Sequence, residues 1–204
     1  MFVRTESFGQ FLKYYPIISI IIAIQIVFFL MMRIPFFPNN LIFESFSGVN
    51  VFIFEGEYWR LITPILMHVG FSHLFFNSFS LILFGPALER ALGKITFLIV
   101  YFTCGLGANI ATLFIHPPYY VHIGASGAIF GLFGVYLAVI LFKKEAMPQQ
   151  GRQVIIPIAV ISVIMTFFQS GVNITGHIFG VISGILIGKL LIQLGKMDFN
   201  KTYS

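Results

Sequence analysis

Five polar side chains stand out in an otherwise apolar sequence, because their types do chemistry in many enzymes. Ser126 lies in a Gly-Ala-Ser-Gly segment, and His177 lies in a second glycine-rich segment. His73 and Asn77 are four residues apart, so they share one face of a helix, and His68 lies just upstream. A serine beside a histidine is a nucleophile beside its general base. The chemistry therefore depends on whether the fold brings these three segments together.

Each of these residues also has a common structural explanation. A serine at a glycine-rich helix start is often an N-cap. A lone histidine in an apolar helix often binds a backbone carbonyl, and the His73/Asn77 pair could simply bridge two helices. Each of these explanations accounts for one residue or pair and must be assumed independently, whereas a single site accounts for all five residues.

The composition indicates which elements must position these residues. The chain has 204 residues, of which 58% are hydrophobic and 9% are charged, against about 25% charged in soluble domains. This excludes a soluble globular enzyme, and disorder would require far more charge. A single cysteine, Cys104, excludes a disulfide scaffold. The remaining class is an all-α, polytopic membrane protein.

Long runs without Asp, Glu, Lys or Arg predict six transmembrane helices in one domain over residues 1–204. The first run is expected to be a retained anchor, since no small-residue cleavage site follows it. The expected spans are residues 14–32, 70–88, 95–115, 126–142, 154–169 and 175–194, followed by a polar tail at 196–204.

The distribution of Lys and Arg predicts the orientation. With the N-terminus inside, ten of the twelve basic residues fall in inner segments, and only Arg33 and Arg60 fall outside. Both termini are therefore expected to be cytoplasmic in a plasma membrane. The second, fourth and sixth spans then run inward, and His73, Ser126 and His177 lie near their starts. All three are expected at a similar depth, in the outer part of the bilayer.

Glycine spacing predicts which helices meet. Glycines recur every four residues along the sixth span, and the fourth span carries three more; they are Gly176, Gly180, Gly184 and Gly188, and Gly127, Gly131 and Gly134. Small residues at this spacing let helix backbones approach closely. Gly180 and Gly184 lie within about 60° of the His177 direction. Packing of the two spans through these faces would make His177 a neighbour of Ser126.

Other classes of function fit less well. No metal is expected, because His68 and His73 are five residues apart, poor helical spacing for joint ligation, and no carboxylate lies at their depth. No nucleic acid is expected. The net charge of +5 comes from Lys and Arg in the expected cytoplasmic segments, and the sequence shows no basic patch of the kind that binds nucleic acid. A transporter would need polar groups at several depths, whereas the inner halves of the fourth and sixth spans are mostly apolar. His116 and His122 flank the Pro117-Pro118 break and are expected at the surface.

The ordered set of motifs resembles the rhomboid family of intramembrane serine proteases, of the minimal six-helix bacterial type. The resemblance runs from Trp59 to Gly188. Its motifs are Trp59-Arg60, His68-x4-His73-x3-Asn77, Glu89-Arg90-Ala91-Leu92-Gly93, Gly124-Ala125-Ser126-Gly127 and Gly176-His177-x-x-Gly180.

The resemblance implies a role for each residue. Ser126 would be the nucleophile and His177 the general base and then acid, a dyad without a carboxylate. His73, Asn77 and the Ser126 backbone N–H would form the oxyanion hole. The remaining site residues would line the site (Gly124, His68) or support it structurally (Trp59, Arg60, Glu89, Phe130, Gly180, Gly184).

The implied substrate is a transmembrane helix of another membrane protein, which enters laterally from the bilayer, past the fifth span, into a site open to the outside. No cofactor is implied. Helical carbonyls are occupied by hydrogen bonds, so the substrate must unwind locally before it is cut. The alternative is a non-catalytic relative that binds transmembrane helices. Neither the natural substrate nor an oligomeric state is specified by the sequence.

Two positions depart from the family pattern. Phe130 stands where the family often has a tyrosine stacked on the catalytic histidine, and Gly176 stands where it often has alanine. Neither change removes a catalytic group. Because histidine titrates near a pKa of about 6.5, cleavage is expected to fall in acid as His177 is protonated.

Overall fold

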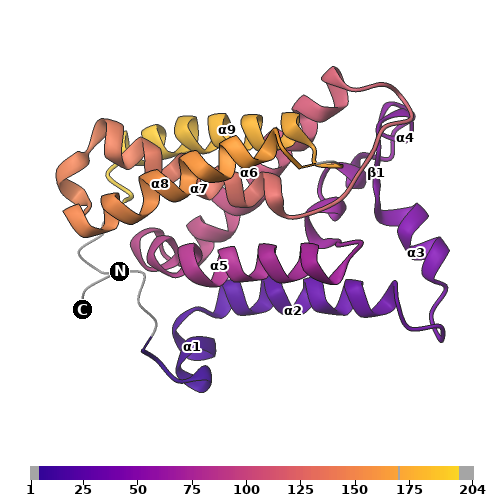
Figure 1. Cartoon of the computed structure of the whole chain (residues 1–204), viewed down its shortest axis with the longest axis horizontal. Helices are drawn as coiled ribbons and strands as arrows, with labels where there is room; N and C mark the ends of the chain where they lie inside the picture. The colour runs from indigo at the N-terminus through magenta and orange to yellow at the C-terminus, as the bar shows by residue number, and fades with distance from the viewer. Residues whose placement is uncertain (1–4, 170, 198–204) are drawn as a thin grey trace.

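The structure, a computed structural model, is a bundle of helices that lie side by side (Figure 1). It describes residues 5–169 and 171–197. Within these residues the only strands are β1 (Gly48–Val49) and β2 (Val121–His122), which pair antiparallel. The expected helical class is confirmed by this architecture. The polar tail expected at 196–204 lies mostly outside the described residues.

The first expected span begins at a sharp bend in the chain. Between α1 (Phe8–Tyr14) and α2 (Pro16–Met31) the helix direction bends by 108°. Pro16 begins α2 because proline fits the first helical position, where no intrahelical N–H bond is needed. Glu89, only 2% exposed, satisfies the next two N–H groups: its carboxylate oxygens accept from Ile17 and Ile18, each at 3.1 Å. A carboxylate at a helix N-terminus is favourable.

The segment between α2 and α5 is compact and largely apolar. It contains α3 (Asn39–Phe46), β1, α4 (Asn50–Phe54), η1 (Tyr58–Leu61) and η2 (Thr63–Leu66).

Buried Arg60 ties this segment together. Its guanidinium donates to the Glu57 carboxylate at 2.5 Å and to the carbonyls of Glu44 and Ser47 at 2.5 and 2.8 Å. The Trp59 indole donates to the Ser45 carbonyl at 3.1 Å. The Trp59-Arg60 pair thus holds the turns that lead into α5.

The remaining long helices form the bundle itself. They are α5 (Phe71–Leu92), α6 (Lys94–Ile115), α7 (Ser126–Phe142), α8 (Gln149–Thr166) and α9 (Ile174–Gln193), with the short η3 (Lys144–Ala146) before α8. Among the described residues, α5, α6 and α9 are long and apolar enough to cross a membrane, and α1 with α2 adds a fourth if counted as one bent span. α7 is an apolar helix of 17 residues. The chain is therefore a multi-pass helical membrane protein.

Glycine contacts hold α7 against α9, as the spacing predicts. A Cβ at Gly180 would collide with the carbonyl oxygen of Gly127, and one at Gly184 would collide with that of Gly131. At Gly134 an added Cβ would meet the backbone of α9. Only glycine allows this backbone-to-backbone approach. The expected packing of the fourth and sixth spans through their glycine faces is confirmed.

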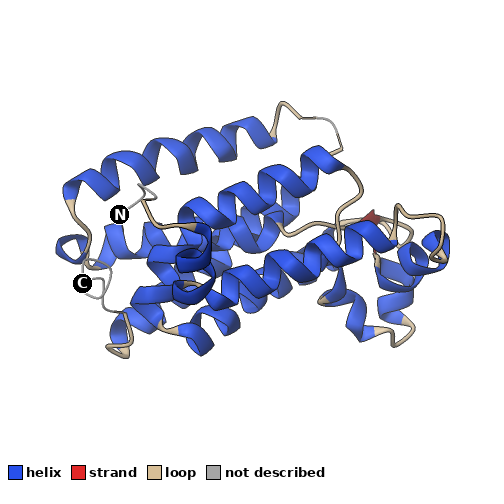
Figure 2. Cartoon of the chain, turned by 90° about the horizontal axis from the view of Figure 1, so that it is seen from below, coloured by secondary structure: helices blue, strands red, loops and turns tan. Residues whose placement is uncertain are grey.

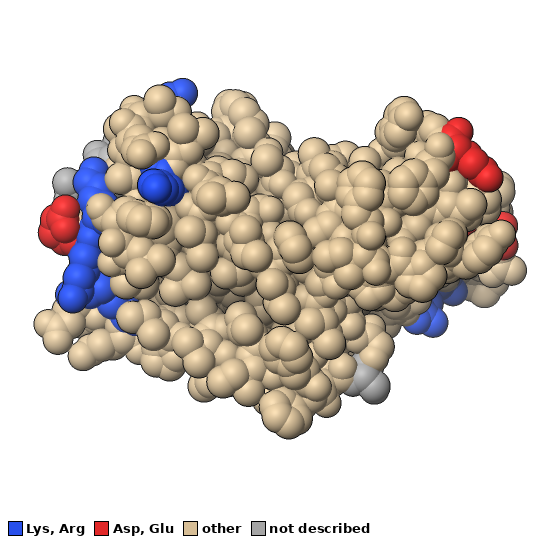
Figure 3. All heavy atoms as spheres, turned by 90° about the horizontal axis from the view of Figure 1, so that it is seen from above, with Lys and Arg blue, Asp and Glu red and all other residues tan. Residues whose placement is uncertain are grey.

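Charge is concentrated at the ends of the molecule. Figure 3 shows Lys and Arg gathered at one end and uncharged side chains across the middle of that face. Several basic residues lie at helix ends: Lys94 begins α6, Lys143 follows α7 and Lys189 lies near the end of α9. Figure 2 shows α8 at one side of the bundle, outside the other helices.

Candidate functional site

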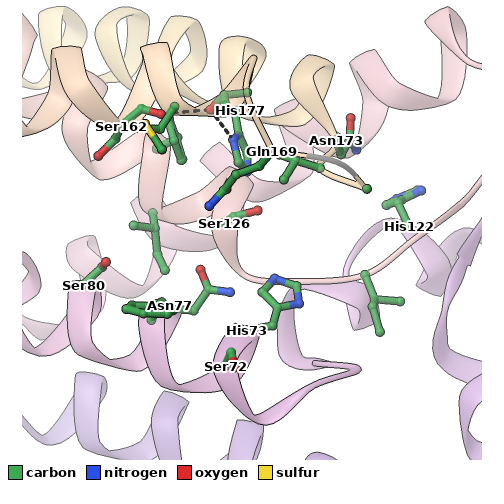
Figure 4. Close-up of a pocket in the computed structure, with 18 of the residues that line it drawn as sticks. Ser72, His73, Asn77, Ser80, His122, Ser126, Ser162, Gln169, Asn173 and His177 are labelled. Carbon is green, nitrogen blue, oxygen red and sulfur yellow. Dashed lines mark hydrogen bonds between the residues drawn. The ribbon is translucent and has the colours of Figure 1, made fainter.

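A pocket of about 930 Å³ opens between α5, α7, α8 and the start of α9 (Figure 4). Much of its lining is apolar, but polar side chains reach it from every one of these elements. The polar lining residues are Ser72, His73, Asn77, Ser80, Tyr120, His122, Ser126, Ser162, Thr166, Gln169, Asn173 and His177.

Ser126 is the first residue of α7, so its backbone N–H lies at a helix N-terminus, where no intrahelical acceptor is available. The chain reaches it through a turn at Gly124, whose φ of +130° is strained for other residues. A Cβ at Gly124 would lie 2.6 Å from Cε1 of His73. The Gly124 N–H donates to the Pro64 carbonyl at 2.8 Å, which fixes the turn. Glycine at this position therefore allows His73 to approach the serine turn.

His177 lies in the first turn of α9 and is 8% exposed. The Asn173 side chain caps this helix by accepting from the Gly176 N–H at 2.9 Å. The Phe130 ring of α7 stacks on the imidazole, with centroids 4.0 Å apart and planes 14° apart. Thr166 Oγ1 lies 2.8 Å from His177 Nδ1. The imidazole is thus held on its face by α7 and at one nitrogen by α8.

His73 and Asn77 project from α5 on the other side of Ser126. Figure 4 shows Ser126 between His177 and these two side chains. Asn77 is 8% exposed, and among the described residues no group accepts a hydrogen bond from its Nδ2. Buried polar donors normally have partners, so an unpaired amide facing a pocket is noteworthy. The structure therefore brings the sequence-predicted residues Ser126, His177, His73 and Asn77 into one pocket.

His68 lies behind His73, fully buried, in the loop before α5. The two rings are 4.9 Å apart and inclined at 72°. Burial, with a smaller contribution from the nearby His73, lowers the pKa of His68 to about 3. His68 is therefore neutral at physiological pH and supports His73 as an uncharged neighbour.

The expected surface position of His122 is wrong. His122 is 7% exposed and lines the pocket, because the β1–β2 pairing places it opposite Gly48. A Cβ at Gly48 would collide with the imidazole ring. Burial first, and His116 second, lowers the pKa of His122 to about 4. The ring therefore packs as a neutral group against β1, in the segment that leads to Ser126.

Several further polar lining residues were missed by sequence reasoning, among them Gln169 and Thr166. Gln169 is in the polar stretch that marks the break between the last two spans, and its side chain extends into the pocket (Figure 4). Thr166 ends α8, and its bond to His177 joins residues from separate helices. A single threonine in an apolar run carries no sequence signal of such a contact.

Comparison with known proteins matches the sequence to one family. Residues 55–194 match the model of the Rhomboid domain. The chain is 47% identical over 193 residues to YdcA of Bacillus subtilis (strain 168), named as a candidate rhomboid protease, covering 95% of this chain and 97% of that protein. It is 37% identical over 172 residues to rhomboid protease GluP of the same organism, covering 83% of this chain but only 34% of GluP. Rhomboid-like protease 1 of Toxoplasma gondii is 29% identical over 187 residues, covering 84% of this chain and 63% of that protein.

Proposed function

The chain belongs to the rhomboid family of intramembrane proteases, and we propose that it hydrolyses its substrates with Ser126 as nucleophile and His177 as general base. The observation that carries this assignment is the shared pocket, in which a serine at a helix N-terminus lies near a histidine held by Phe130 and Thr166. Nucleophile, base and an orienting group are the arrangement expected of acyl transfer.

The proposed reaction begins when Ser126 Oγ attacks the carbon of the scissile carbonyl. Its proton passes to Nε2 of His177, and the carbonyl oxygen becomes an oxyanion. The tetrahedral intermediate collapses, the C–N bond breaks, and His177 returns the proton to the leaving amine. Water then attacks the acyl-enzyme ester, with His177 again as base, and the new carboxylate leaves as Ser126 recovers its proton.

The oxyanion is proposed to bind donors from two helices. The Ser126 N–H lies at the start of α7, where the helix dipole also favours negative charge. The Asn77 amide, unpaired among the described residues, and His73 approach from α5. Such donors act most strongly when they are already oriented before reaction and shielded from water. The close contact of His73 with Gly124 supports this orientation.

Substrate is proposed to reach the pocket from the bilayer, between α5 and α8. Both helices supply lining residues, including Phe76 and Asn77 from α5 and Ile161 and Met165 from α8. A transmembrane helix with small residues near its outer end would unwind most easily there, because its carbonyls must be freed before attack.

The proposed topology has six crossings, made by α2, α5, α6, α7, α8 and α9, in a bacterial plasma membrane. The concentration of Lys and Arg at one end of the molecule (Figure 3) supports a cytoplasmic position for that end and for both termini. The pocket would then open to the outer side, since the starts of α5, α7 and α9 lie at the opposite end.

The test is cleavage of a single-span protein with Gly and Ala near its outer end, by the purified chain in liposomes. Wild type is expected to cleave. Ser126→Ala and His177→Ala are each expected to lower the rate by at least about a thousandfold, because members of such a unit act together. Ser19→Ala is the matched control, since the Ser19 hydroxyl bonds its own helix at the Tyr15 carbonyl. It is expected to cleave at the wild-type rate.

Cleavage that persists in both site variants would exclude Ser126 and His177 as the dyad. Binding of the substrate helix by folded wild type without any cleavage would instead favour the non-catalytic, helix-binding alternative.

A further inference from the structure

Thr166 has a position that neither the family motifs nor the proposed dyad explains. It is the last residue of α8 and is 2% exposed. Four residues of α8 are buried, Gly151, Ile155, Ala159 and Thr166, and their spacing places them on one face of the helix. Thr166 is the only one with a polar side chain. Its hydroxyl is therefore the polar contact that α8 makes through its buried face.

The Thr166 hydroxyl makes two contacts at hydrogen-bond distance. Oγ1 lies 3.0 Å from the Ser162 carbonyl oxygen, one turn earlier in α8, and 2.8 Å from Nδ1 of His177. A carbonyl oxygen can only accept, so the single hydroxyl hydrogen is directed to Ser162. For both contacts to be hydrogen bonds, Oγ1 must accept a hydrogen from His177, which places the imidazole proton on Nδ1. If the hydroxyl donated to His177 instead, no hydrogen would lie between Oγ1 and the Ser162 carbonyl oxygen.

This assignment fixes the tautomer of the histidine. A neutral imidazole carries one proton, so a proton on Nδ1 leaves a lone pair on Nε2. Figure 4 shows the dashed contact to Nδ1 reaching the His177 ring from above, while Ser126 lies below the ring. Nε2 is therefore the nitrogen available to accept the serine proton, as a general base must be.

We propose that Thr166 is a positioning residue, which holds the His177 proton on Nδ1 and thereby keeps Nε2 ready to act as base. The inference rests on the proposed role of His177. In a Ser-His-Asp triad a buried carboxylate performs this orienting task. A hydroxyl does the same with a neutral acceptor, which avoids burying a charge within the membrane. Phe130 fixes the plane of the ring, and Thr166 fixes its rotation within that plane.

The test compares Thr166→Val, which keeps the shape and removes the hydroxyl, with Thr166→Ser, which keeps the hydroxyl. Thr175→Val is the matched control, because Thr175 Oγ1 bonds a different histidine, His116, at 3.0 Å. For each variant, kcat and KM are measured on the single-span substrate in liposomes. The share of His177 protonated at Nδ1 is measured by ¹⁵N NMR of histidine-labelled protein in micelles.

Thr166→Val is expected to lower kcat about tenfold, the usual scale for losing one hydrogen bond that orients a reacting group, with KM within about twofold of wild type. The share of the Nδ1-protonated tautomer is expected to fall in the same variant. Thr166→Ser is expected to restore both quantities, and Thr175→Val to leave both unchanged.

An unchanged tautomer share in Thr166→Val would overturn the inference, whatever its rate. Equal loss of kcat in Thr166→Val and Thr166→Ser would also overturn it, since that pattern indicates a packing role. If wild type fails to cleave, the proposed function fails, while the tautomer measurement still decides whether Thr166 sets the proton position.

Discussion

α7, the helix that begins with Ser126, is packed very differently from α8, which lines another side of the pocket. Eleven of the 17 residues of α7 are buried, and its glycines touch the backbone of α9 directly. Only four of the 18 residues of α8 are buried, and α8 lies at the side of the bundle (Figure 2). The proposed nucleophile and base thus share a rigid pair of helices, while the proposed access route borders a loosely embedded one.

The difference assigns two requirements, precise positioning and substrate access, to separate helices. A single helix could not meet both. Proton transfer needs atoms held within a few tenths of an ångström, and backbone contact through glycine provides that precision. Substrate access needs a wall that can move, and a helix with one narrow buried face can move at low cost. The imidazole of His177 receives one contact from each region, the Phe130 ring from α7 and the Thr166 hydroxyl from α8.

The largest effect is expected from breaking the rigid pair. In Gly184→Ala the new methyl group would collide with the Gly131 carbonyl oxygen, a backbone atom that cannot rotate away. We expect a loss of about 3 kcal/mol or more in unfolding free energy, at the upper end for overpacking, and a corresponding loss of cleavage. Denaturant titration in micelles, followed by the fluorescence of the single tryptophan, Trp59, measures the change.

The matched control is the same substitution at an open glycine. Gly9 lies in α1, and nothing lies within 4 Å of an added Cβ there. Gly9→Ala is expected to leave cleavage unchanged and to stabilise slightly, by up to about 1 kcal/mol. Equal stability of the two variants would mean that the α7–α9 contact is not close packed.

Amide hydrogen exchange tests the comparison without any substitution. Because α8 has few buried residues, its amides are expected to exchange at least about tenfold faster than those of α7. Mass spectrometry of the protein in nanodiscs, with peptides assigned to each helix, gives the ratio. Equal protection of the two helices would remove the argument that α8 is the movable wall.

A smaller effect is expected where the rigid region contacts the imidazole. Phe130→Leu removes the stacked ring but keeps an apolar side chain, and kcat is expected to fall about tenfold as the imidazole gains freedom. Phe130→Tyr preserves the ring and is expected to stay within about twofold of wild type. Steady-state cleavage in liposomes distinguishes the two. A wild-type rate for Phe130→Leu would show that stacking does not position the histidine.

The helix pairing and the cluster of polar residues could be predicted because both follow from periodicity. Glycines at four-residue spacing predict close approach of α7 and α9, and the observed contacts at Gly180 and Gly184 confirm it. Topology predicts that Ser126, His73 and His177 lie at one depth, and all three line one pocket. On a helix, the spacing of residues in the sequence determines their positions in three dimensions, since each residue adds a fixed rise and rotation.

The contacts of Thr166 and His122 could not be predicted, because neither follows from periodicity. Thr166 meets His177 only because α8 and α9 pack with a particular rotation. His122 is buried by a two-residue strand pairing with Gly48, more than seventy residues earlier. Short strands with so few residues have no alternation to detect. The short helix α1 and its bend into α2 were not predicted, because α1 lies before the apolar run and contains Lys13, and only Pro16 marks the break.

The smallest effect is expected in the segment that leads to Ser126, where acid acts through the titration of His122, whose ring is buried. The pKa of buried His122 is lowered to about 4 in the folded protein, whereas an unfolded histidine titrates near about 6.5. The unfolded chain therefore takes up a proton first, so the stability contributed by the neutral ring is complete above about pH 6.5 and declines as the pH falls toward 4. Between pH 7.5 and 5.5 this loss is about 1 kcal/mol.

His122→Gln carries no titrating group, so its unfolding free energy should depend less on pH by that amount. Thermal unfolding in micelles at the two pH values measures this difference. An unchanged pH dependence in His122→Gln would show that the His122 ring is hydrated in the folded protein and that this segment is not close packed.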